Sequence, residues 1–502
     1  MDMTRLSAAR VGELQDSGAS TSQRLVAGSR ARIAAGDGTC NAIAFLNPDA
    51  DGEAGRLDRE RGEGSVRGPL HGVPILVKDN IATGDAMMTT AGSLALDGVR
   101  APADAHVVRR LRDAGLVLLG KTNLSEWANF RSSRSVTGWS SRGGQVRNAR
   151  FRDRSPGGSS SGSGTAVARG FTALAIGTET DGSVVIPAAM NGIVGIKPTV
   201  GLVSRTGVIP ISASQDTAGP MARTVEDAAL LLGAISGSDP DDPATERADD
   251  HAGDFTRFLD ADALRGARIG VVRSYCGWHE AVDAVFAAAL AQMAEAGACI
   301  VEDVRLPGRD VIRPHEIVVM CAEFRTGLDH YLAQLAEHGV AAPVRSLADV
   351  IAFNEANAAR TMPWFGQDLM ALSQASGGAT GSRYLDARDE CLRLAREDGI
   401  DRALETLRLD ALVAPTAPAP WAIDLANGDH RLGGSSTPAA VAGYPSVTVP
   451  MGDLAGLPLG LSMFAGAWQE GRLVGLAHAF EKLGAVRHAS TEPVTVSRNW
   501  LA

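Results

Sequence analysis

Two glycine-rich turns that carry serines stand close together in the first half of the chain. The first is SPGGSSSGSG at residues 155–164, and the second is GTETDGSVVIPA at residues 177–188. Because glycine has no Cβ, such turns let several backbone N–H groups converge on a closely bound molecule. The layout could therefore hold two hydroxyls near each other on tight backbone, as serine chemistry at a carbonyl requires.

A flexible linker is the alternative for the first turn, because residues 157–164 contain only glycine and serine. The segment is, however, followed at once by a small and largely apolar run, residues 165–176, which can pack closely against a sheet or a helix. The second glycine turn comes directly after that run. This order favours a turn with a defined structure over a flexible linker.

A known nucleophile motif also matches the first turn, since GSSSG at residues 158–162 fits G-x-S-x-G with Ser160 as the nucleophile. That motif needs a buried strand directly before it, whereas residues 150–156 are charged and end in a proline. The downstream histidines are better explained as surface or helix-face residues: His430, His478 and His488. The sequence also lacks the G-x-x-x-x-G-K-[ST] pattern of phosphate loops and the H-E-x-x-H pattern of zinc proteases.

Serine chemistry without an obvious histidine directs attention to lysine, because a deprotonated lysine is the usual substitute base. Lys78 ends a short apolar run, GVPILV at residues 72–77, which predicts a buried strand with a lysine at its tip. Burial would lower the lysine pKa from its value of about 10.4 in water. An ordinary strand-end lysine is the alternative that the strand pattern alone would favour.

The composition permits a large folded core and points away from nucleic acids. The chain has 502 residues, of which 45% are hydrophobic, and its formal net charge is −10. This charge argues against a surface that neutralises phosphates. Five scattered cysteines without a C-x-x-C pair fit neither a zinc site nor a disulfide framework. No apolar run reaches the roughly 18 residues that span a bilayer, so we expect no membrane contact and a cytoplasmic location, or export if a signal segment has been removed.

Helix and strand signals alternate along the chain, which predicts one large α/β domain over residues 1–502. Apolar spacing predicts a helical hairpin near residues 4–35, with Thr21 or Ser22 as the N-cap of its second helix. The expected parts of the domain are N-terminal helices (1–65), a core that holds both serine turns (66–230), a mostly helical peripheral region (310–408), and C-terminal strands with a helix (409–502).

On these residues the chain resembles the amidase signature family over nearly its whole length, from the strand that ends in Lys78 through both serine turns to the C-terminal strands. In that family a lysine, a serine of the first turn and a serine 24 positions later form a Ser-Ser-Lys triad. The same spacing separates Ser159 from Ser183 here. The resemblance therefore assigns Lys78, Ser159 and Ser183 as catalytic residues, in a relay that needs Lys78 uncharged.

The resemblance also implies a fold and further site residues. The fold would be a single domain with a central mixed β-sheet covered by helices on both faces. Gly158 and Ser159 would be joined by a cis peptide bond, and Ser160 would support the relay by hydrogen bonding. The oxyanion hole would be formed by backbone N–H groups, namely those of Thr180, Asp181, Gly182 and Ser183, with Asp181 contributing only its N–H. No cofactor and no metal is implied.

Departures from the commonest family pattern place the chain nearer one branch. The second turn has Glu179 and Asp181, a variant similar to that of the peptide amidases, which release ammonia from the C-terminal carboxamide of peptides. Other similar segments are residues 89–96, 120–130, 138–145 and 211–220. Such specificity would need a pocket closed beyond the scissile nitrogen. Three aromatic residues could line it, although core packing is an alternative for each: Trp127, Phe130 and Trp139.

Two other functions compete with this interpretation. An amidase of aryl amides, carbamates or small aliphatic amides would use the same triad. An amidotransferase A-type subunit would work only inside a tRNA-binding complex, but its usual second turn differs from this one and the acidic charge offers no RNA surface. The expected partner is therefore an amide substrate, with no nucleic acid, for a monomer or a homodimer.

Overall fold

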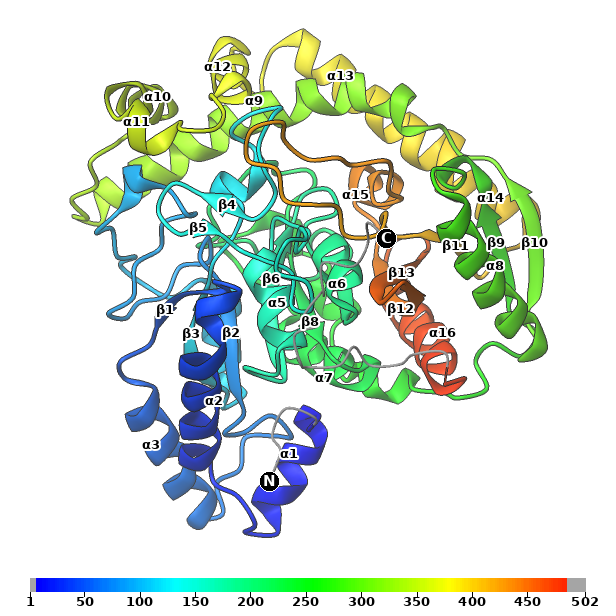
Figure 1. Ribbon diagram of the computed structural model, residues 1–502, viewed down its shortest axis with the longest axis horizontal. Helices are drawn as coiled ribbons and strands as arrows, with labels where there is room; N and C mark the ends of the chain where they lie inside the picture. Colours follow the sequence, from blue (N-terminus) through cyan, green and yellow to red (C-terminus); the bar gives the residue numbers. More distant parts are fainter. Residues whose placement is uncertain (1–5, 485–502) are drawn as a thin grey trace, which may run out of the picture.

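The computed structural model describes residues 6–484, and an 11-stranded mixed sheet runs through this part of the chain (Figure 1). The strand order is β1-β3-β2-β6-β8-β7-β12-β13-β11-β9-β10. The strands are β1 (Ile43–Leu46), β2 (Pro74–Lys78), β3 (Val117–Thr122), β6 (Leu174–Glu179), β7 (Val194–Lys197), β8 (Thr217–Ala222), β9 (Arg268–Val272), β10 (Cys299–Val304), β11 (Ala411–Pro415), β12 (Ser446–Leu454) and β13 (Leu457–Phe464). A separate two-stranded sheet pairs β4 (Trp139–Ser140) with β5 (Gly144–Gln145).

Helices surround the sheet, as the sequence predicts. They are α1 (Ala8–Asp16), α2 (Ser22–Gly36), α3 (Ala50–Gly62), α4 (His106–Asp113), α5 (Ser161–Ala168), α6 (Val185–Asn191), α7 (Val225–Ile235), α8 (Glu280–Glu295), α9 (Arg309–Glu337), α10 (Leu347–Ala356), α11 (Ala358–Thr361), α12 (Asp368–Ala375), α13 (Ser382–Leu392), α14 (Asp401–Leu407), α15 (Thr437–Ala442) and α16 (Glu470–Lys482). In the described residues, no helix is both long and apolar enough to cross a membrane.

The strand β2 shows why helices cover both faces of the sheet. It lies between β3 and β6, parallel to both, and all five of its residues are buried. Ile75 and Val77 pack into one apolar cluster with α4, α7 and α16, while Leu76 packs into another with α2, α3 and α5. A strand buried on both faces must be apolar throughout, so its sequence runs Pro-Ile-Leu-Val without a polar residue until Lys78.

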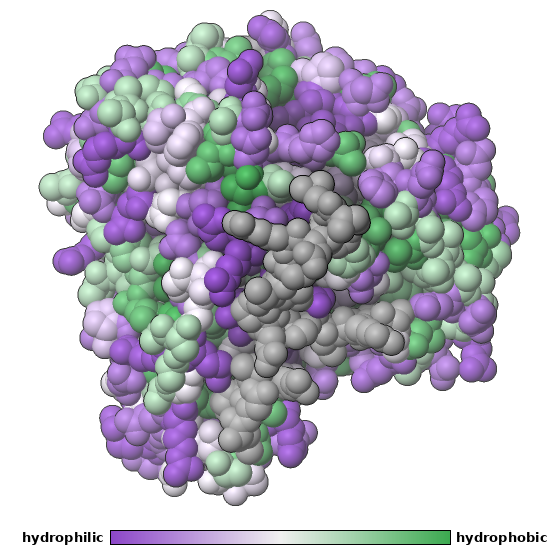
Figure 2. All heavy atoms as spheres, in the orientation of Figure 1, coloured by the Kyte–Doolittle hydropathy of each residue, from purple (hydrophilic) through white to green (hydrophobic). Residues whose placement is uncertain are grey.

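The N-terminal helices match their sequence signals. The predicted hairpin is α1 and α2, and the Thr21 hydroxyl accepts a hydrogen bond from the Arg24 N–H, which confirms Thr21 as the N-cap of α2. The next helix, α3, carries acidic residues in its first turn and arginines in its last turn. Hydrophilic residues gather over α2 and α3 at the lower left of the molecule (Figure 2).

The helical region predicted at residues 310–408 is formed by α9 to α14, which arch along the upper edge of the molecule (Figure 1). The long helix α9 packs Phe324 edge-on against Phe130, with ring centroids 5.3 Å apart. This contact joins the helical arch to the segment just after β3. His488 lies outside the described residues.

Close backbone packing fixes the start of α5, directly after the first serine turn. A Cβ on Gly162 would lie 2.3 Å from the carbonyl oxygen of Ala42 and 2.5 Å from that of Asn123. By contrast, a Cβ on Gly52 of α3 would meet nothing within 4 Å.

We predict opposite effects for two glycine substitutions. Gly162→Ala should lower the free energy of unfolding by about 2 kcal/mol or more, because backbone atoms would have to move apart. Gly52→Ala should raise it by up to about 1 kcal/mol, because alanine favours helix. Urea denaturation of both variants is the measurement, and a Gly162→Ala protein as stable as the parent would contradict the packing described.

Candidate active site

The two serine turns meet at one edge of the sheet because β2 and β6 are parallel neighbours. Their carboxyl ends are Lys78 and Glu179, so these residues emerge at the same edge. The second turn follows β6 directly, and the first turn precedes α5, which packs on both strands. The Ser160 N–H donates to the carbonyl oxygen of Ser183 at 3.1 Å, which joins the turns to each other.

Lys78 is fully buried and contacts the first turn. Its Nζ lies 2.8 Å from Ser159 Oγ, 2.8 Å from Thr178 Oγ1 and 3.1 Å from the carbonyl oxygen of Thr178. Burial lowers the pKa of Lys78 to about 7, against the opposing effect of the carboxylates of Asp216 and Glu179. A large share of this amine is therefore uncharged at neutral pH.

The residues of the first turn lie where the sequence placed them. The peptide bond between Gly158 and Ser159 is cis, as the resemblance implied. Ser160 does not hydrogen bond to the Lys78 amine or to the Ser159 hydroxyl. It instead donates to the carbonyl oxygen of Thr178 at 3.0 Å and accepts from the Thr178 N–H at 3.2 Å. Ser160 thus holds the strand residue that also binds Lys78.

Glu179 organises the second turn, a role that the sequence analysis missed. Its carboxylate is buried and accepts hydrogen bonds from the N–H groups of Val184 at 2.7 Å and Val185 at 3.0 Å. These bonds tie the end of β6 to the start of α6, and so bend residues 180–183 into a tight loop in which Gly182 has a φ of 84°. The loop presents its backbone toward the first turn.

The Asp181 side chain also takes part, which corrects the expectation that Asp181 contributes only its backbone N–H. Its carboxylate accepts hydrogen bonds from Ser436 Oγ at 2.6 Å and Thr437 Oγ1 at 2.9 Å, at the start of α15. Burial raises the pKa of Asp181, but Arg431 and the Ser436 hydroxyl outweigh it and hold that pKa below its usual value. Asp181 therefore stays ionised and anchors the loop to the C-terminal part of the chain.

A second carboxylate braces the same loop from the other side. Asp216 accepts a hydrogen bond from Thr180 Oγ1 at 2.5 Å, and it also accepts from the N–H groups of Ile211 at 2.7 Å and Ser212 at 2.9 Å. Burial raises the pKa of Asp216 to about 6. Thr180 and Asp181 are thus each fixed by a side-chain contact, and their N–H groups are held in a defined direction.

The loop opens onto a pocket of about 380 Å³. Ser183 lines this pocket together with Gly158, Thr180 and Asp181, whereas Ser159 and Lys78 lie beneath it with no exposed surface. Ser183 itself is 8% exposed. The pocket therefore gives a bound molecule access to one of the three predicted catalytic residues and keeps water from the other two.

Of the three aromatic residues proposed for substrate contact, Phe130 alone lines the pocket. Trp127 packs in the apolar cluster beneath α9, and Trp139 packs edge-on against Phe365 with ring centroids 5.1 Å apart. Core packing, the alternative considered for each, describes these two tryptophans. The pocket wall gains instead Trp421, which comes from the loop between β11 and α15 and lies far away in the sequence.

Comparison with known proteins places this site in a family. A family model described as Amidase matches residues 24–474. A probable amidase of Arabidopsis thaliana is 40% identical over 458 residues, which cover 89% of this chain and 84% of that protein. The chain belongs to the amidase family. It is accordingly a hydrolase of amide C–N bonds.

Among solved structures, two of peptide amidases are similar to this chain over nearly its whole length. The crystal structure of a peptide amidase with the competitive inhibitor chymostatin has a TM-score of 0.93 and 49% identity, and covers 97% of this chain and 99% of that one. The native peptide amidase from Stenotrophomonas maltophilia has a TM-score of 0.90 and 48% identity, and covers 97% of this chain and 98% of that one. The A-type subunit of the glutamyl-tRNA(Gln) amidotransferase of Halorhodospira halophila is also similar, at 37% identity over 83% of this chain and 84% of that protein.

The pocket of this amidase has one wall of unusual backbone. Trp127, Ala128 and Asn129 all have positive φ angles, between 50° and 71°. Runs of non-glycine residues in this conformation are rare and cluster at functional sites. Asn129 lines the pocket, and its buried Oδ1 has no hydrogen-bond partner among residues 6–484. The segment therefore places in the wall that also includes Ser183 a residue whose side-chain acceptor has no partner among residues 6–484, which no sequence pattern indicated.

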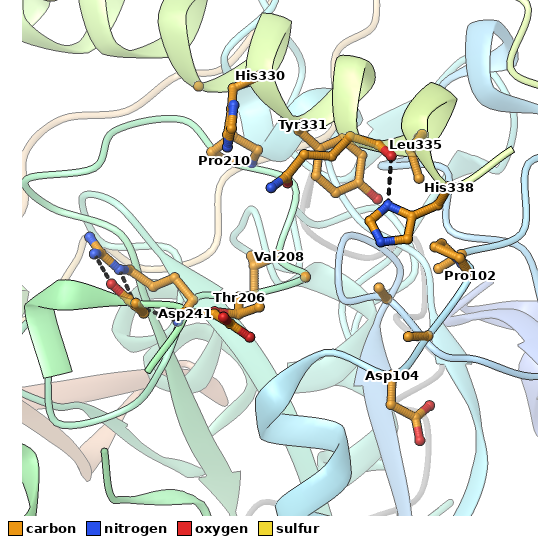
Figure 3. Close-up of a pocket in the computed structure, with 18 of the residues that line it drawn as sticks. Pro102, Asp104, Thr206, Val208, Pro210, Asp241, His330, Tyr331, Leu335 and His338 are labelled. Atoms are coloured by element: carbon orange, nitrogen blue, oxygen red, sulfur yellow. Dashed lines mark hydrogen bonds and ion pairs between the residues drawn. The ribbon is translucent and has the colours of Figure 1, made fainter. Parts of the chain in front are cut away.

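A second cavity, of about 630 Å³, lies apart from Lys78, Ser159 and Ser183 (Figure 3). Its wall combines side chains of α9, such as His330 and Tyr331, with loop residues such as Pro102 and Val208. Lys78, Ser159 and Ser183 are not among the residues that line it. It touches the site only through Asp216.

The anchoring role of Asp181 leads to a prediction. Asp181→Asn removes one of two acceptor oxygens, so the loop should loosen and kcat/KM for amide hydrolysis should fall by about tenfold or more. Steady-state kinetics on one amide substrate is the measurement. Asp424→Asn is the control, because the Asp424 side chain bonds only to nearby residues of its own loop. Equal kinetics of both variants would show that the anchor is dispensable.

Proposed function

We propose that this amidase hydrolyses the C-terminal carboxamide of peptides and releases ammonia. The observation that carries the proposal is the likeness to peptide amidases, which extends over 97% of the chain at 49% identity. Lys78, both serine turns and the residues that line the pocket all fall within residues 24–474, which the Amidase family model matches. The amide chemistry follows from the family, and the choice of peptide carboxamides is the part that we propose.

In the proposed mechanism, Ser183 Oγ attacks the carbonyl carbon of the carboxamide. Ser183 gives its proton to Ser159, which gives its own to the uncharged amine of Lys78 at 2.8 Å. The negative charge that develops on the carbonyl oxygen is met by the N–H groups of the loop from Thr180 to Ser183. The relay then runs backwards, the C–N bond breaks, and the leaving nitrogen departs as ammonia.

The acyl-enzyme is released by the same groups. Water takes the place of ammonia and loses a proton through Ser159 to Lys78 as it attacks the acyl carbon. The proton returns to Ser183 as the ester bond breaks, which frees a peptide with a C-terminal carboxylate. The burial of Lys78 supports this cycle, because an amine with a pKa of about 7 can both take and return a proton near neutral pH.

One residue of the pocket wall supports recognition of a carboxamide. Asn129 Oδ1 is an acceptor without a partner in the described part of the chain, and the NH₂ group of a carboxamide offers N–H donors. A buried acceptor that is left unpaired is costly, so a substrate that satisfies it is favoured over one that does not. We therefore assign Asn129 to recognition of the amide.

The first test is mass spectrometry of the protein with one short peptide in two forms. The peptide amide should gain about one mass unit with release of ammonia, whereas the same peptide extended by one residue should remain intact. An aryl anilide is included as a third substrate. Turnover of the anilide alone would support the broader amidase function and contradict the proposal.

Amidotransferase activity is the second candidate, because subunits of that kind align over most of this chain. Release of ammonia from free glutamine, without turnover of any peptide amide, would favour it.

Substitutions test the assigned roles. Ser183→Ala should abolish turnover, and Lys78→Ala should lower kcat by about 10³-fold or more, because the proton relay loses its base. Lys78→Met, which keeps most of the side-chain volume, should do the same without a cavity. Lys482→Ala is the control, since Lys482 is an exposed lysine at the end of α16. A Lys78→Met protein with near-normal kcat would remove Lys78 as the base.

The pKa of Lys78 predicts the pH dependence. Because the working form is the uncharged amine and its pKa is about 7, kcat/KM should rise with pH below 7 and level off above it. Rates on a peptide amide between pH 5 and 9, with unfolding monitored over the same range, provide the measurement. A rate that stays constant down to pH 5 would contradict this assignment.

A further inference from the structure

Three arginines line the pocket beside Ser183. Arg309 and Arg313 come from the first turn and a half of α9, and Arg431 comes from the loop between β11 and α15. All three act on one acid, because each of them lowers the pKa of Asp181. They therefore lie near the loop of residues 180–183, although they come from two elements that are far apart in the sequence.

Two of these arginines form no close ion pair in the part of the chain that the structure describes, although Arg431 is attracted to Asp181 and Asp429. Arg313 forms an ion pair with Glu316 at 2.9 Å. Arg431 donates from Nε to the carbonyl oxygen of Gly433 at 3.2 Å, and it makes no ion pair within residues 6–484. Arg309 is exposed and forms neither an ion pair nor a side-chain hydrogen bond with any described residue.

The two acids that line the pocket also accept hydrogen bonds from neutral donors. Asp181 accepts from the hydroxyls of Ser436 and Thr437. Asp429 accepts from the hydroxyl of Thr137 and from the indole N–H of Trp421, the latter at 3.0 Å. The pocket thus combines two arginines that lack ion pairs with carboxylates that are bound to neutral donors. Asp181 and Asp429 also attract Arg431, so Arg309 is the arginine of the wall whose charge no described acid offsets at ion-pair distance.

From this arrangement we propose that the pocket selects peptide amides whose acyl side carries a carboxylate, namely an acidic side chain near the scissile amide, bound by Arg309 and Arg431. This inference rests on the proposed function, in which the leaving group is ammonia, so that any further recognition must act on the acyl side. Guanidinium groups suit a carboxylate because their planar N–H donors match its two oxygens.

The alternative is that the arginines only hold the loop between β11 and α15 in place. The two roles differ in what they change. A substrate-binding arginine affects KM for charged substrates and makes it depend on salt, because ion pairs at an open pocket are screened. A merely structural arginine would affect all substrates alike and would lower the stability of the fold.

The test uses acetyl-trialanine amide in which each alanine in turn is replaced by Glu or by Gln. At one position or more, the Glu peptide should have a KM lower by about tenfold than its Gln counterpart, with similar kcat. In about 0.5 M NaCl the KM values of the Glu and Gln peptides should differ less, because salt screens the attraction between exposed charges. Arg309→Gln and Arg431→Gln should each bring the KM values of the Glu and Gln peptides closer together. Arg305→Gln should not, because Arg305 is exposed and pairs with Asp303 outside the pocket.

The outcomes separate the two proposals. Turnover of both peptides with equal KM at all three positions overturns the inference and leaves the proposed function intact. A Glu preference that survives in both Arg309→Gln and Arg431→Gln overturns the assignment to these arginines. Turnover of neither peptide, together with hydrolysis of an anilide, overturns the proposed function and the inference with it.

Discussion

The site depends on one amine, the Nζ of Lys78, that is fully buried from solvent. Lys78 stands at the end of a strand buried on both faces, and its Nζ is surrounded by the first serine turn and by Thr178. Desolvation disfavours the charged form of an amine, so the strand that places Lys78 also sets its pKa. The two carboxylates that oppose this effect, Asp216 and Glu179, are the same ones that shape the second turn. The same two carboxylates therefore affect both the pKa of Lys78 and the geometry of the second turn.

The second turn is built from both ends of the chain. Glu179 closes it locally onto α6, whereas Asp181 fastens it to Ser436 and Thr437, more than 250 residues later in the sequence. The C-terminal strands thus do more than complete the sheet, because they carry the loop that supplies the anchor and part of the pocket wall. This explains why a small amidase site needs a large domain around it.

The apolar run before Lys78 is enough to predict its burial, which the structure confirms. The resemblance to the amidase signature family assigns Lys78, Ser159 and Ser183, and the structure brings Lys78 Nζ and Ser159 Oγ within 2.8 Å, whereas the catalytic roles stay a prediction. The contributions of Asn129, Trp421 and Arg431 could not be predicted, because they depend on contacts between distant segments. The same limit applies to Trp127 and Trp139. An aromatic residue in the core and one in a pocket have the same local pattern, and packing partners such as Phe365 decide between them.

The proposed relay requires Lys78 to be largely uncharged near neutral pH, and its pKa can be measured directly. The chain contains four lysines, so the signals of isotope-labelled lysine side chains can be followed by NMR through a pH titration and assigned with Lys78→Met. We predict that the Lys78 signal titrates near pH 7. A pKa of about 10, as in water, would contradict the proposed base and the relay that depends on it.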